Sequence, residues 1–357
     1  AMLADDVVHD LNQGAREVGK DAFAAFLGRM NASYREQLRF NLDKKVSLSQ
    51  LKQAWQYIVS RHPTLRSIYS WQDKSQPFQV VLKDAQLHWV EHDLRHLAAQ
   101  DSKHSIKELS LRARQSKLQL DQRPPLQMDY FELADGSAEL VFSFTHLQLD
   151  GWSMALISNE VEAILHQLST NEPIVLPPPG DYKEYVKWLL SRDKAASVHY
   201  WQQLLADCEP TSAVHLWQQQ AHENSDTVQG IYCHQIERSH SELIHQFCRQ
   251  HGLTLNAFML SIFGLLNNLS ANQSRSIIGS VVSGRPVEVA DIERTAGFFS
   301  NALPTYIETR TELSVIDWLK HKQKQLVESW DHSFISLEQI KTSVNLAVTD
   351  PLFSTLF

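Results

Sequence analysis

A histidine, an aspartate and a glycine lie where one predicted element gives way to the next. His146 follows the apolar run 140–144, which predicts a buried strand, and Asp150-Gly151 precedes the apolar positions of a predicted helix. Loops after strands carry much of the chemistry of α/β proteins, and histidine is well suited to proton transfer near neutral pH. We therefore interpret His146 as a candidate proton acceptor and Asp150 as a brace for its loop. A core histidine and a helix-capping aspartate are the alternative interpretation.

Periodicity predicts the elements that position this loop. They are a helix over 49–60, strands at 79–82 and 138–144, a helix over 153–167, a helical stretch over 181–205, helices over 241–250 and 254–269, and a strand at 277–282. Ser241 is the predicted N-cap of the 241–250 helix and Gly252 its stop. This mixture of strands and helices predicts layered α/β lobes.

A proline-rich break marks the predicted lobe boundary. Asn171-Glu172-Pro173 is followed by Pro177-Pro178-Pro179-Gly180, and consecutive prolines cannot continue a helix. We therefore divide the chain into an N-terminal lobe, residues 1–172, that carries the histidine loop, and a C-terminal lobe, residues 173–357. A chain of 357 residues is long enough for two such cores.

Composition excludes several classes of function. The net charge of −8 argues against a nucleic-acid binder, and no apolar run reaches the length of a membrane span. Residues 1–20 are polar and of mixed charge, so they do not form a signal peptide. The only cysteines, Cys208, Cys233 and Cys248, indicate a reducing, cytoplasmic location. His245 and Cys248 alone do not make a metal site, and no glycine-rich phosphate loop is present.

The histidine loop resembles the H-H-x-x-x-D-G signature of the condensation domains of non-ribosomal peptide synthetases. Further segments resemble motifs of that family, in its order, from about residue 33 to the end. They are Arg61-His62-Pro63-Thr64-Leu65-Arg66, Asp121 with Pro125-Leu126, Tyr185 and Trp188 with Tyr200-Trp201, Ser283-Gly284-Arg285-Pro286, Gly297 to Pro304, and Pro351-Leu352-Phe353. Any one match is weak, whereas the ordered set is specific.

The resemblance implies an α/β fold with two chloramphenicol-acetyltransferase-like lobes arranged as a V around a central tunnel. It implies an enzyme that joins aminoacyl or peptidyl thioesters through an amide bond. The partners would be donor and acceptor peptidyl carrier proteins and a neighbouring adenylation domain, with neither nucleic acid nor membrane. The phosphopantetheine arm would belong to the carrier proteins, so the chain would need no cofactor or metal of its own.

The same resemblance implies roles for individual residues. His146 and Gly151 would be catalytic, whereas Thr145, Asp150, Arg285 and Asn301 would be structural at the active site. Asp150 and Arg285 would form a partly buried bidentate pair across the lobes. The backbone at Gly151 and the helix start at Ser153 would face the oxyanion, and Asn301 would bond backbone or substrate.

Residue type alone predicts the roles of several neighbouring side chains. Trp152 and Trp201 are expected to be packing residues. Arg61 and Arg66 are expected to form structural salt bridges, and His62 to be buried with a satisfied ring.

Two departures from the family pattern leave alternatives open. Thr145 stands where the family has its first histidine, and threonine can hydrogen-bond but cannot carry charge. The family's opening segment is not recognisable in residues 1–30 and the end looks truncated, which suggests a fragment or a degenerate protein. The alternatives are a non-catalytic scaffold that docks carrier or tailoring proteins and a CoA-dependent acyltransferase of the same fold. Epimerisation and heterocyclisation fit the motif less well.

Overall fold

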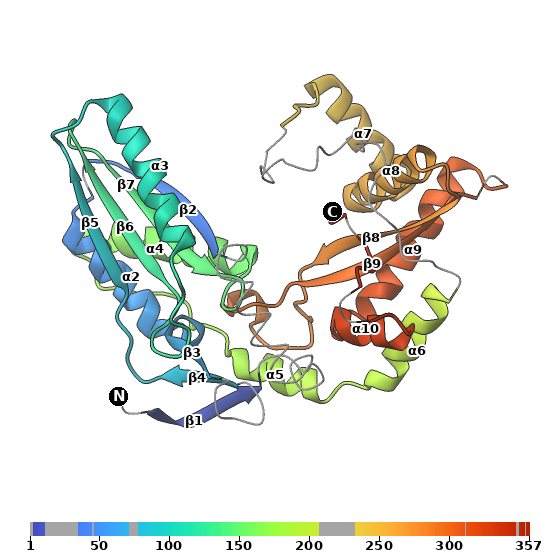
Figure 1. Cartoon of the computed structure of the whole chain (residues 1–357), viewed down its shortest axis with the longest axis horizontal. Helices are drawn as coiled ribbons and strands as arrows, with labels where there is room; N and C mark the ends of the chain where they lie inside the picture. Colours follow the sequence, from blue (N-terminus) through green and yellow to red (C-terminus); the bar gives the residue numbers. More distant parts are fainter. Residues whose placement is uncertain are drawn as a thin grey trace. The chain divides into compact units, whose positions relative to one another are not determined.

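The computed structural model describes residues 3–10, 35–44, 46–70, 78–206, 233–310, 312–347, 350–353 and 355–357. Cys208 and most of residues 1–30, discussed above, lie outside these ranges. The chain divides into two compact units (Figure 1). The first unit is Ala1–Arg192 with Arg285–Phe299, and the second unit is Asp193–Gly284 with Ser300–Phe357.

The first unit is a four-stranded sheet with helices on both faces, beside a small three-stranded sheet. Its elements are β1 (Leu3–Asp10), β2 (Arg35–Leu42), α2 (Leu48–Arg61), η1 (Pro63–Arg66), β3 (Ser67–Ser70), β4 (Phe78–Leu82), β5 (His88–Leu94), α3 (Ala99–Gln115), β6 (Gln127–Leu133), β7 (Ala138–Thr145), α4 (Gly151–Ser169), α5 (Tyr182–Leu190) and η3 (Ile292–Arg294). The strand orders are β2-β7-β6-β5 and β1-β4-β3. Among the described strands of this unit, only β5 and β6 pair in parallel.

Alternation along the strands explains why both faces of the large sheet are covered. Phe142 of β7 packs with Trp55 of α2 and Ile157 of α4, whereas Val141 packs with Ile106 of α3. Successive strand residues point to opposite faces, so α2 and α4 cover one face and α3 the other (Figure 1). The helix over 49–60 and the strand at 138–144 are confirmed with small shifts of their ends.

The proline-rich segment packs on the first unit instead of linking two lobes. Ile174 and Leu176 pack against the core formed by α2, α4 and the sheet. The N–H of Gly180 donates to the carbonyl of Arg294 at 3.1 Å, and a Cβ at Gly180 would lie 2.0 Å from Oγ1 of Thr295. The observed division therefore differs from the predicted boundary after residue 172, because the extended prolines lie along the core surface.

The second unit is a two-stranded sheet covered by helices. Its elements are α6 (Lys194–Leu205), α7 (Arg238–His251), α8 (Leu255–Ser270), β8 (Arg275–Val282), β9 (Asn301–Glu308), α9 (Val315–Asp331) and α10 (Leu337–Ser343). Strands β8 and β9 are antiparallel, and residues 355–357 run along the other edge of β8. Helices α7, α8 and α9 pack around Ile278, whereas α6 and α10 pack around Ile277.

Two predicted boundaries are wrong, and local capping explains the first. The stretch 181–205 is two helices, because Asp193 caps α6 by accepting hydrogen bonds from the N–H groups of Ala195 and Ala196. Helix α7 begins at Arg238 after Glu237, so Ser241 is not its N-cap. Gly252 does end α7, with a φ of 68° that favours glycine.

Neither a single membrane-spanning helix nor a metal-binding cluster is found among the described residues. No single described helix is long and apolar enough to span a membrane, and α7 and α8 pass that test only as a pair bent by 107°. The described residues also contain no group of three or more His, Cys, Asp or Glu side chains placed to hold a metal ion.

Candidate active site

His146 lies in the turn between β7 and α4, with one ring nitrogen committed. Its Nδ1 lies 2.9 Å from the carbonyl oxygen of Leu149. A carbonyl only accepts hydrogen bonds, so the neutral imidazole carries its proton on Nδ1 and has its lone pair on Nε2. No partner for Nε2 is found within the described ranges, and the side chain is half-buried. This nitrogen can therefore accept a proton from a bound molecule.

Thr145 stabilises the turn from within the core. Its side chain is fully buried, and its Oγ1 accepts a hydrogen bond from the N–H of Leu147 at 3.3 Å. Its carbonyl accepts from the N–H of Gln148 at 3.0 Å. Thr145 thus fixes the backbone on either side of His146 without the charge that an imidazole could carry.

The segment after α2 clamps the same turn. Oη of Tyr69 donates to the carbonyl of Leu147 at 2.8 Å, and burial raises the pKa of Tyr69 well above its ordinary value. Gln148 and Thr64 exchange two hydrogen bonds of 3.0 Å, each from a side chain to the other's carbonyl. The turn is consequently held by donors and acceptors from a segment far away in the sequence.

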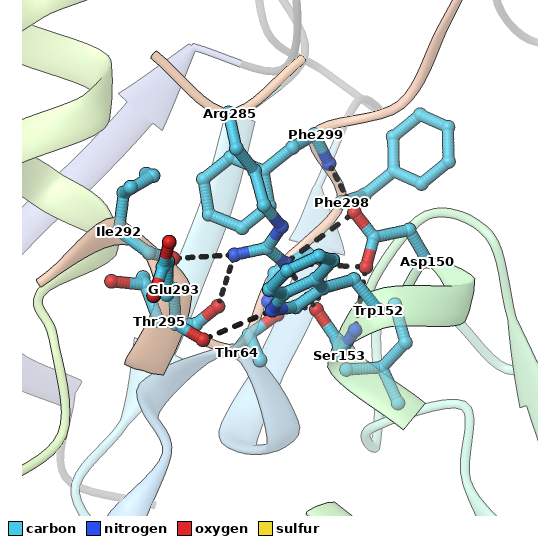
Figure 2. A network of polar contacts seen from close by, with 12 residues as sticks. Thr64, Asp150, Trp152, Ser153, Arg285, Ile292, Glu293, Thr295, Phe298 and Phe299 are labelled. Carbon is cyan, nitrogen blue, oxygen red and sulfur yellow. Dashed lines mark hydrogen bonds and ion pairs between the residues drawn. The ribbon is translucent and has the colours of Figure 1, made fainter. Parts of the chain in front are cut away.

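Asp150 combines three functions in one buried carboxylate (Figure 2). It caps α4, because Oδ1 accepts from the N–H of Ser153 at 2.8 Å. Oδ2 accepts from the N–H of Phe299 at 3.2 Å. Nη2 of Arg285 lies 3.3 Å from Oδ1 and 3.5 Å from Oδ2. The helix-capping and ion-pairing interpretations of Asp150 both describe its contacts.

Arg285 reaches Asp150 through a single nitrogen. Nη1 instead donates to the carbonyls of Ile292 at 2.6 Å and Thr295 at 2.9 Å. The expected bidentate geometry is therefore wrong, because two backbone carbonyls occupy the other arm of the fork. The pair also lies within the first unit instead of crossing between units. Burial lowers the pKa of Arg285, and the nearby Asp150 charge opposes that shift.

Aromatic rings enclose the Arg285 guanidinium (Figure 2). The ring centroid of Phe299 lies 3.9 Å from its central carbon, and that of Trp152 lies 5.6 Å away. Trp152 is half exposed and donates its indole N–H to the carbonyl of Glu293 at 3.0 Å. It was predicted to be a packing residue, which is wrong: it ties α4 to segment 285–299 from the surface.

Gly151 begins helix α4 on an open side of the turn. A Cβ at this position would meet no atom within 4 Å. The N–H groups of Gly151 and Trp152 precede the first hydrogen bond of the helix, and in the described part of the chain neither has an acceptor. These two donors are available to a bound anion or carbonyl oxygen.

Asn301 at the start of β9 has only structural contacts among the described residues. Its Nδ2 donates to the carbonyls of Ser333 at 2.8 Å and Ile335 at 2.7 Å. Its Oδ1 accepts from the N–H of Ala302 at 2.9 Å. Of the two roles considered for Asn301, the structure supports backbone bonding inside the second unit.

The remaining motif residues divide between confirmed and wrong predictions. Arg61 pairs with Glu160 at 3.2 Å, and the buried His62 donates to the same carboxylate at 2.6 Å, as expected. Arg66 bonds the backbone carbonyls of Val59, Leu82 and Lys83 instead of a carboxylate. Trp201 is fully buried, which confirms its predicted packing role.

Sequence reasoning missed Ser153. Its Oγ donates to the carbonyl of Gly297 at 2.7 Å and accepts from the N–H of Gly297 at 3.0 Å and from Nη2 of Arg285 at 2.9 Å. The available signal was a small polar residue on the apolar face of a helix that begins at a capping aspartate.

Comparison with known proteins identifies the family. A family model described as "Condensation domain" matches residues 23–357. One linear gramicidin synthase protein of Brevibacillus parabrevis is 28% identical over 337 residues, which are 94% of this chain and 7% of that protein. Surfactin synthase subunit 3 of Bacillus subtilis is 25% identical over 323 residues, which are 90% of this chain and 25% of that protein. The chain therefore spans a quarter or less of these relatives.

Solved structures agree in fold. The first condensation domain of the calcium-dependent antibiotic synthetase matches with a TM-score of 0.78 and 18% identity, over 98% of this chain and 80% of that one. The epimerization domain from the third module of tyrocidine synthetase B matches with a TM-score of 0.75 and 20% identity, over 97% and 80% respectively. These likenesses confirm the predicted α/β fold class. From the match over residues 23–357, the chain belongs to the condensation domain family.

Proposed function

We propose that this chain forms an amide bond between carrier-tethered aminoacyl or peptidyl thioesters. The observation that carries the proposal is the fixed tautomer of His146, whose Nδ1 donates to the Leu149 carbonyl and leaves Nε2 as the proton acceptor. Family membership supplies the reaction class, and the geometry supplies a base for it.

The reaction needs one proton acceptor and no covalent enzyme intermediate. The neutral amine of the acceptor attacks the thioester carbonyl carbon of the donor, and a C–N bond forms as Nε2 of His146 takes one amine proton. The tetrahedral intermediate then collapses, the C–S bond breaks, and the departing thiolate takes the proton from the imidazolium. A general base contributes a factor of about 10² to 10⁴ to such a step. Holding both substrates together contributes through proximity.

Negative charge on the tetrahedral oxygen requires donors, and Gly151 supports that role. Its N–H and that of Trp152 stand at the positive end of α4, and the space beside the Gly151 Cα is open. Thr145, Asp150 and Arg285 act as positioning residues that hold the turn and segment 285–299. Asn301 holds the backbone of the second unit.

Carrier proteins supply the reacting groups in this proposal. Donor and acceptor peptidyl carrier proteins present their thioesters on phosphopantetheine arms, and a neighbouring adenylation domain loads the acceptor. The named relatives are synthase proteins at least four times as long as the matched region, which supports such neighbours. We further propose a cytoplasmic location, which the reduced Cys233 and Cys248 support.

A condensation assay tests the proposal. Donor and acceptor aminoacyl carrier proteins are mixed with the chain, and the carrier-bound dipeptide is followed by intact-protein mass spectrometry. We expect dipeptide from the parent chain and a rate lower by about 10² or more for His146→Ala. His104→Ala is the matched control, because His104 is an exposed histidine of the same unit.

Two outcomes would overturn the proposal. Equal rates for the parent and His146→Ala would remove His146 from the reaction. No dipeptide from a folded parent that still binds both carrier proteins, across several substrate pairs, would favour a non-catalytic docking scaffold. Product from soluble acyl-CoA in place of the donor carrier would instead identify a CoA-dependent acyltransferase.

A further inference from the structure

The open side of His146 is bordered by one aromatic side chain, that of Phe298. The two ring centroids lie 5.9 Å apart, with an angle of 47° between the planes. Phe144 lies 6.0 Å from the same imidazole at 90°, but its side chain is buried in the core. Phe298 is half-buried, so it is the ring of this pair that a bound molecule can reach.

The backbone before and after Phe298 is fixed by buried partners. The N–H and carbonyl of Gly297 both bond Oγ of Ser153, at 3.0 Å and 2.7 Å. The N–H of Phe299 donates to Oδ2 of Asp150 at 3.2 Å. A side chain held between two anchored neighbours keeps its position when a ligand presses against it.

The carbonyl of Phe298 is anchored as well. Oη of Tyr182 donates to it at 2.9 Å, and a Cβ on Gly297 would lie 2.3 Å from the Tyr182 ring. Figure 2 shows the Phe298 ring turned away from the Arg285 guanidinium, whereas the Phe299 ring lies over it. Of these adjacent phenylalanines, one therefore serves the buried network and the other borders His146.

We propose that Phe298 is a specificity-determining residue that limits the size of the group able to reach Nε2 of His146. Under the proposed function, on which this inference rests, that group is the acceptor aminoacyl moiety. Its amine must come within about 2.6–3.2 Å of Nε2 to transfer a proton. Its Cα and side chain then follow within two bonds, in the space that the Phe298 ring borders.

The expected effect is a change in preference between acceptors. Each methylene gained or lost in an apolar pocket changes discrimination by about 10-fold or more. Phe298→Ala should raise kcat/KM for a leucyl acceptor relative to a glycyl acceptor by roughly 10-fold. Phe298→Trp should shift the same ratio in the opposite direction. Both variants leave the anchoring hydrogen bonds of the segment unchanged, because those bonds involve only backbone atoms of residues 297–299.

The first experiment is a competition assay. One donor carrier protein is offered equal amounts of glycyl, alanyl, leucyl and tryptophanyl acceptor carriers, and the products are quantified by mass. Phe40→Ala is the matched control, because Phe40 is also half-buried but pairs with Leu140, toward the end of β7 that is remote from Thr145. A leucyl-to-glycyl ratio in Phe298→Ala equal to that of the parent would overturn the inference while leaving the proposed function intact.

A second experiment needs no turnover. The chain is treated with bromoacetamide or N-benzylbromoacetamide, and alkylation is located by peptide mass spectrometry. Nε2 of His146 displaces bromide from the CH₂ carbon, so a C–N bond replaces the C–Br bond. Phe298→Ala should raise the ratio of bulky to small adduct at His146 roughly 10-fold, with no change at the exposed His104.

The two experiments separate the two proposals. An unchanged alkylation ratio would show that Phe298 does not limit access, whatever the assay of dipeptide gives. A shifted alkylation ratio without any dipeptide from the parent would remove the proposed function and retain Phe298 as the residue that limits access to His146.

Discussion

Helix α4 carries two buried carboxylates, each paired with an arginine, that hold different parts of the first unit. Asp150 at its N-terminus meets Arg285 at 3.3 Å, and Glu160 in its middle meets Arg61 at 3.2 Å. The chemistry of the two pairs is alike. Their other partners differ, and those partners decide what each pair controls.

Asp150 connects the histidine turn with segment 285–299. Besides Arg285 it accepts from the N–H groups of Ser153 and Phe299, which anchor the residues on either side of the Phe298 ring. Every group in this network therefore fixes backbone close to His146.

Glu160 connects helices and the proline-rich segment. It accepts from His62 at 2.6 Å, and Arg61 also donates to the carbonyl of Pro177. This network joins the end of α2 to α4 and holds the extended chain across them. The comparison teaches that a buried acid–arginine pair identifies a reaction site only through the backbone it orders, and not by its presence.

The largest expected effect is that of Asp150→Ala. It removes the cap of α4 and leaves Arg285 buried without its carboxylate, which should lower the free energy of unfolding by about 3–5 kcal/mol. Dipeptide formation should fall as well, because segment 285–299 and the turn lose a common anchor. Urea unfolding followed by tryptophan fluorescence measures the stability.

Asp150→Asn separates the two roles of the carboxylate. Asparagine caps helices as well as aspartate does, so this variant loses the charge and keeps the cap. An intermediate loss of stability is expected. A loss below about 1 kcal/mol in Asp150→Ala, the range of a surface ion pair, would mean that Arg285 finds water in place of its partner.

Glu160→Gln should affect stability without affecting the reaction. We expect a loss of about 1.5–3 kcal/mol at pH 7, the value for hydrogen bonds to a charged group, and an unchanged rate per folded molecule. Glu162→Gln is the control, since Glu162 is exposed on the same helix. A drop in rate equal to that of the Asp150 variants would remove the distinction between the two networks.

The Glu160 network also predicts a dependence on pH. Burial by itself raises the pKa of Glu160, but hydrogen bonds and positive charge from His62 and Arg61 outweigh it and bring the pKa below its ordinary value of 4.5. A lowered folded pKa gives stability that is fully present above the unfolded pKa and is lost as the pH falls through the folded one. Unfolding between pH 6 and pH 3 should therefore be less pH-dependent in Glu160→Gln than in the parent.

Much of the fold followed from local signals. The strand at 138–144 and the helix over 49–60 were predicted from periodicity, and Gly252 was placed correctly at a helix end. These features depend on neighbours along the chain, which the sequence displays directly. The break at Asp193 is local as well, but a long helical pattern hides a single capping residue.

Tertiary contacts limited the rest. The sequence indicated the Asp150–Arg285 pair only through the family resemblance, and it could not show that backbone carbonyls occupy the other nitrogen of Arg285. The proline-rich segment suggested a linker because its packing against α2 and α4 has no signature in composition. Trp152 was assigned to packing for the same reason: its indole partner is a backbone carbonyl far along the chain.

Tyr69→Phe tests whether the histidine turn depends on a second anchor besides Asp150. It deletes one buried hydrogen bond, to the carbonyl of Leu147, and should lower stability by about 1–1.5 kcal/mol. The pH profile of dipeptide formation should also broaden or shift if the turn then holds His146 less firmly. Tyr57→Phe on α2 is the exposed control. An unchanged profile together with the loss of stability would make Tyr69 a residue of the fold alone.

Trp152→Phe gives the smallest expected effect and tests the comparison most narrowly. It removes the indole hydrogen bond to Glu293 while keeping a ring near Arg285, so stability should fall by only about 0.5–1 kcal/mol. Trp330→Phe is the control, because Trp330 is also about half exposed, at 45% against 50% for Trp152. A loss as large as that of Asp150→Ala would mean that segment 285–299 is held from the surface, and the buried pair would then lose its position as the main anchor.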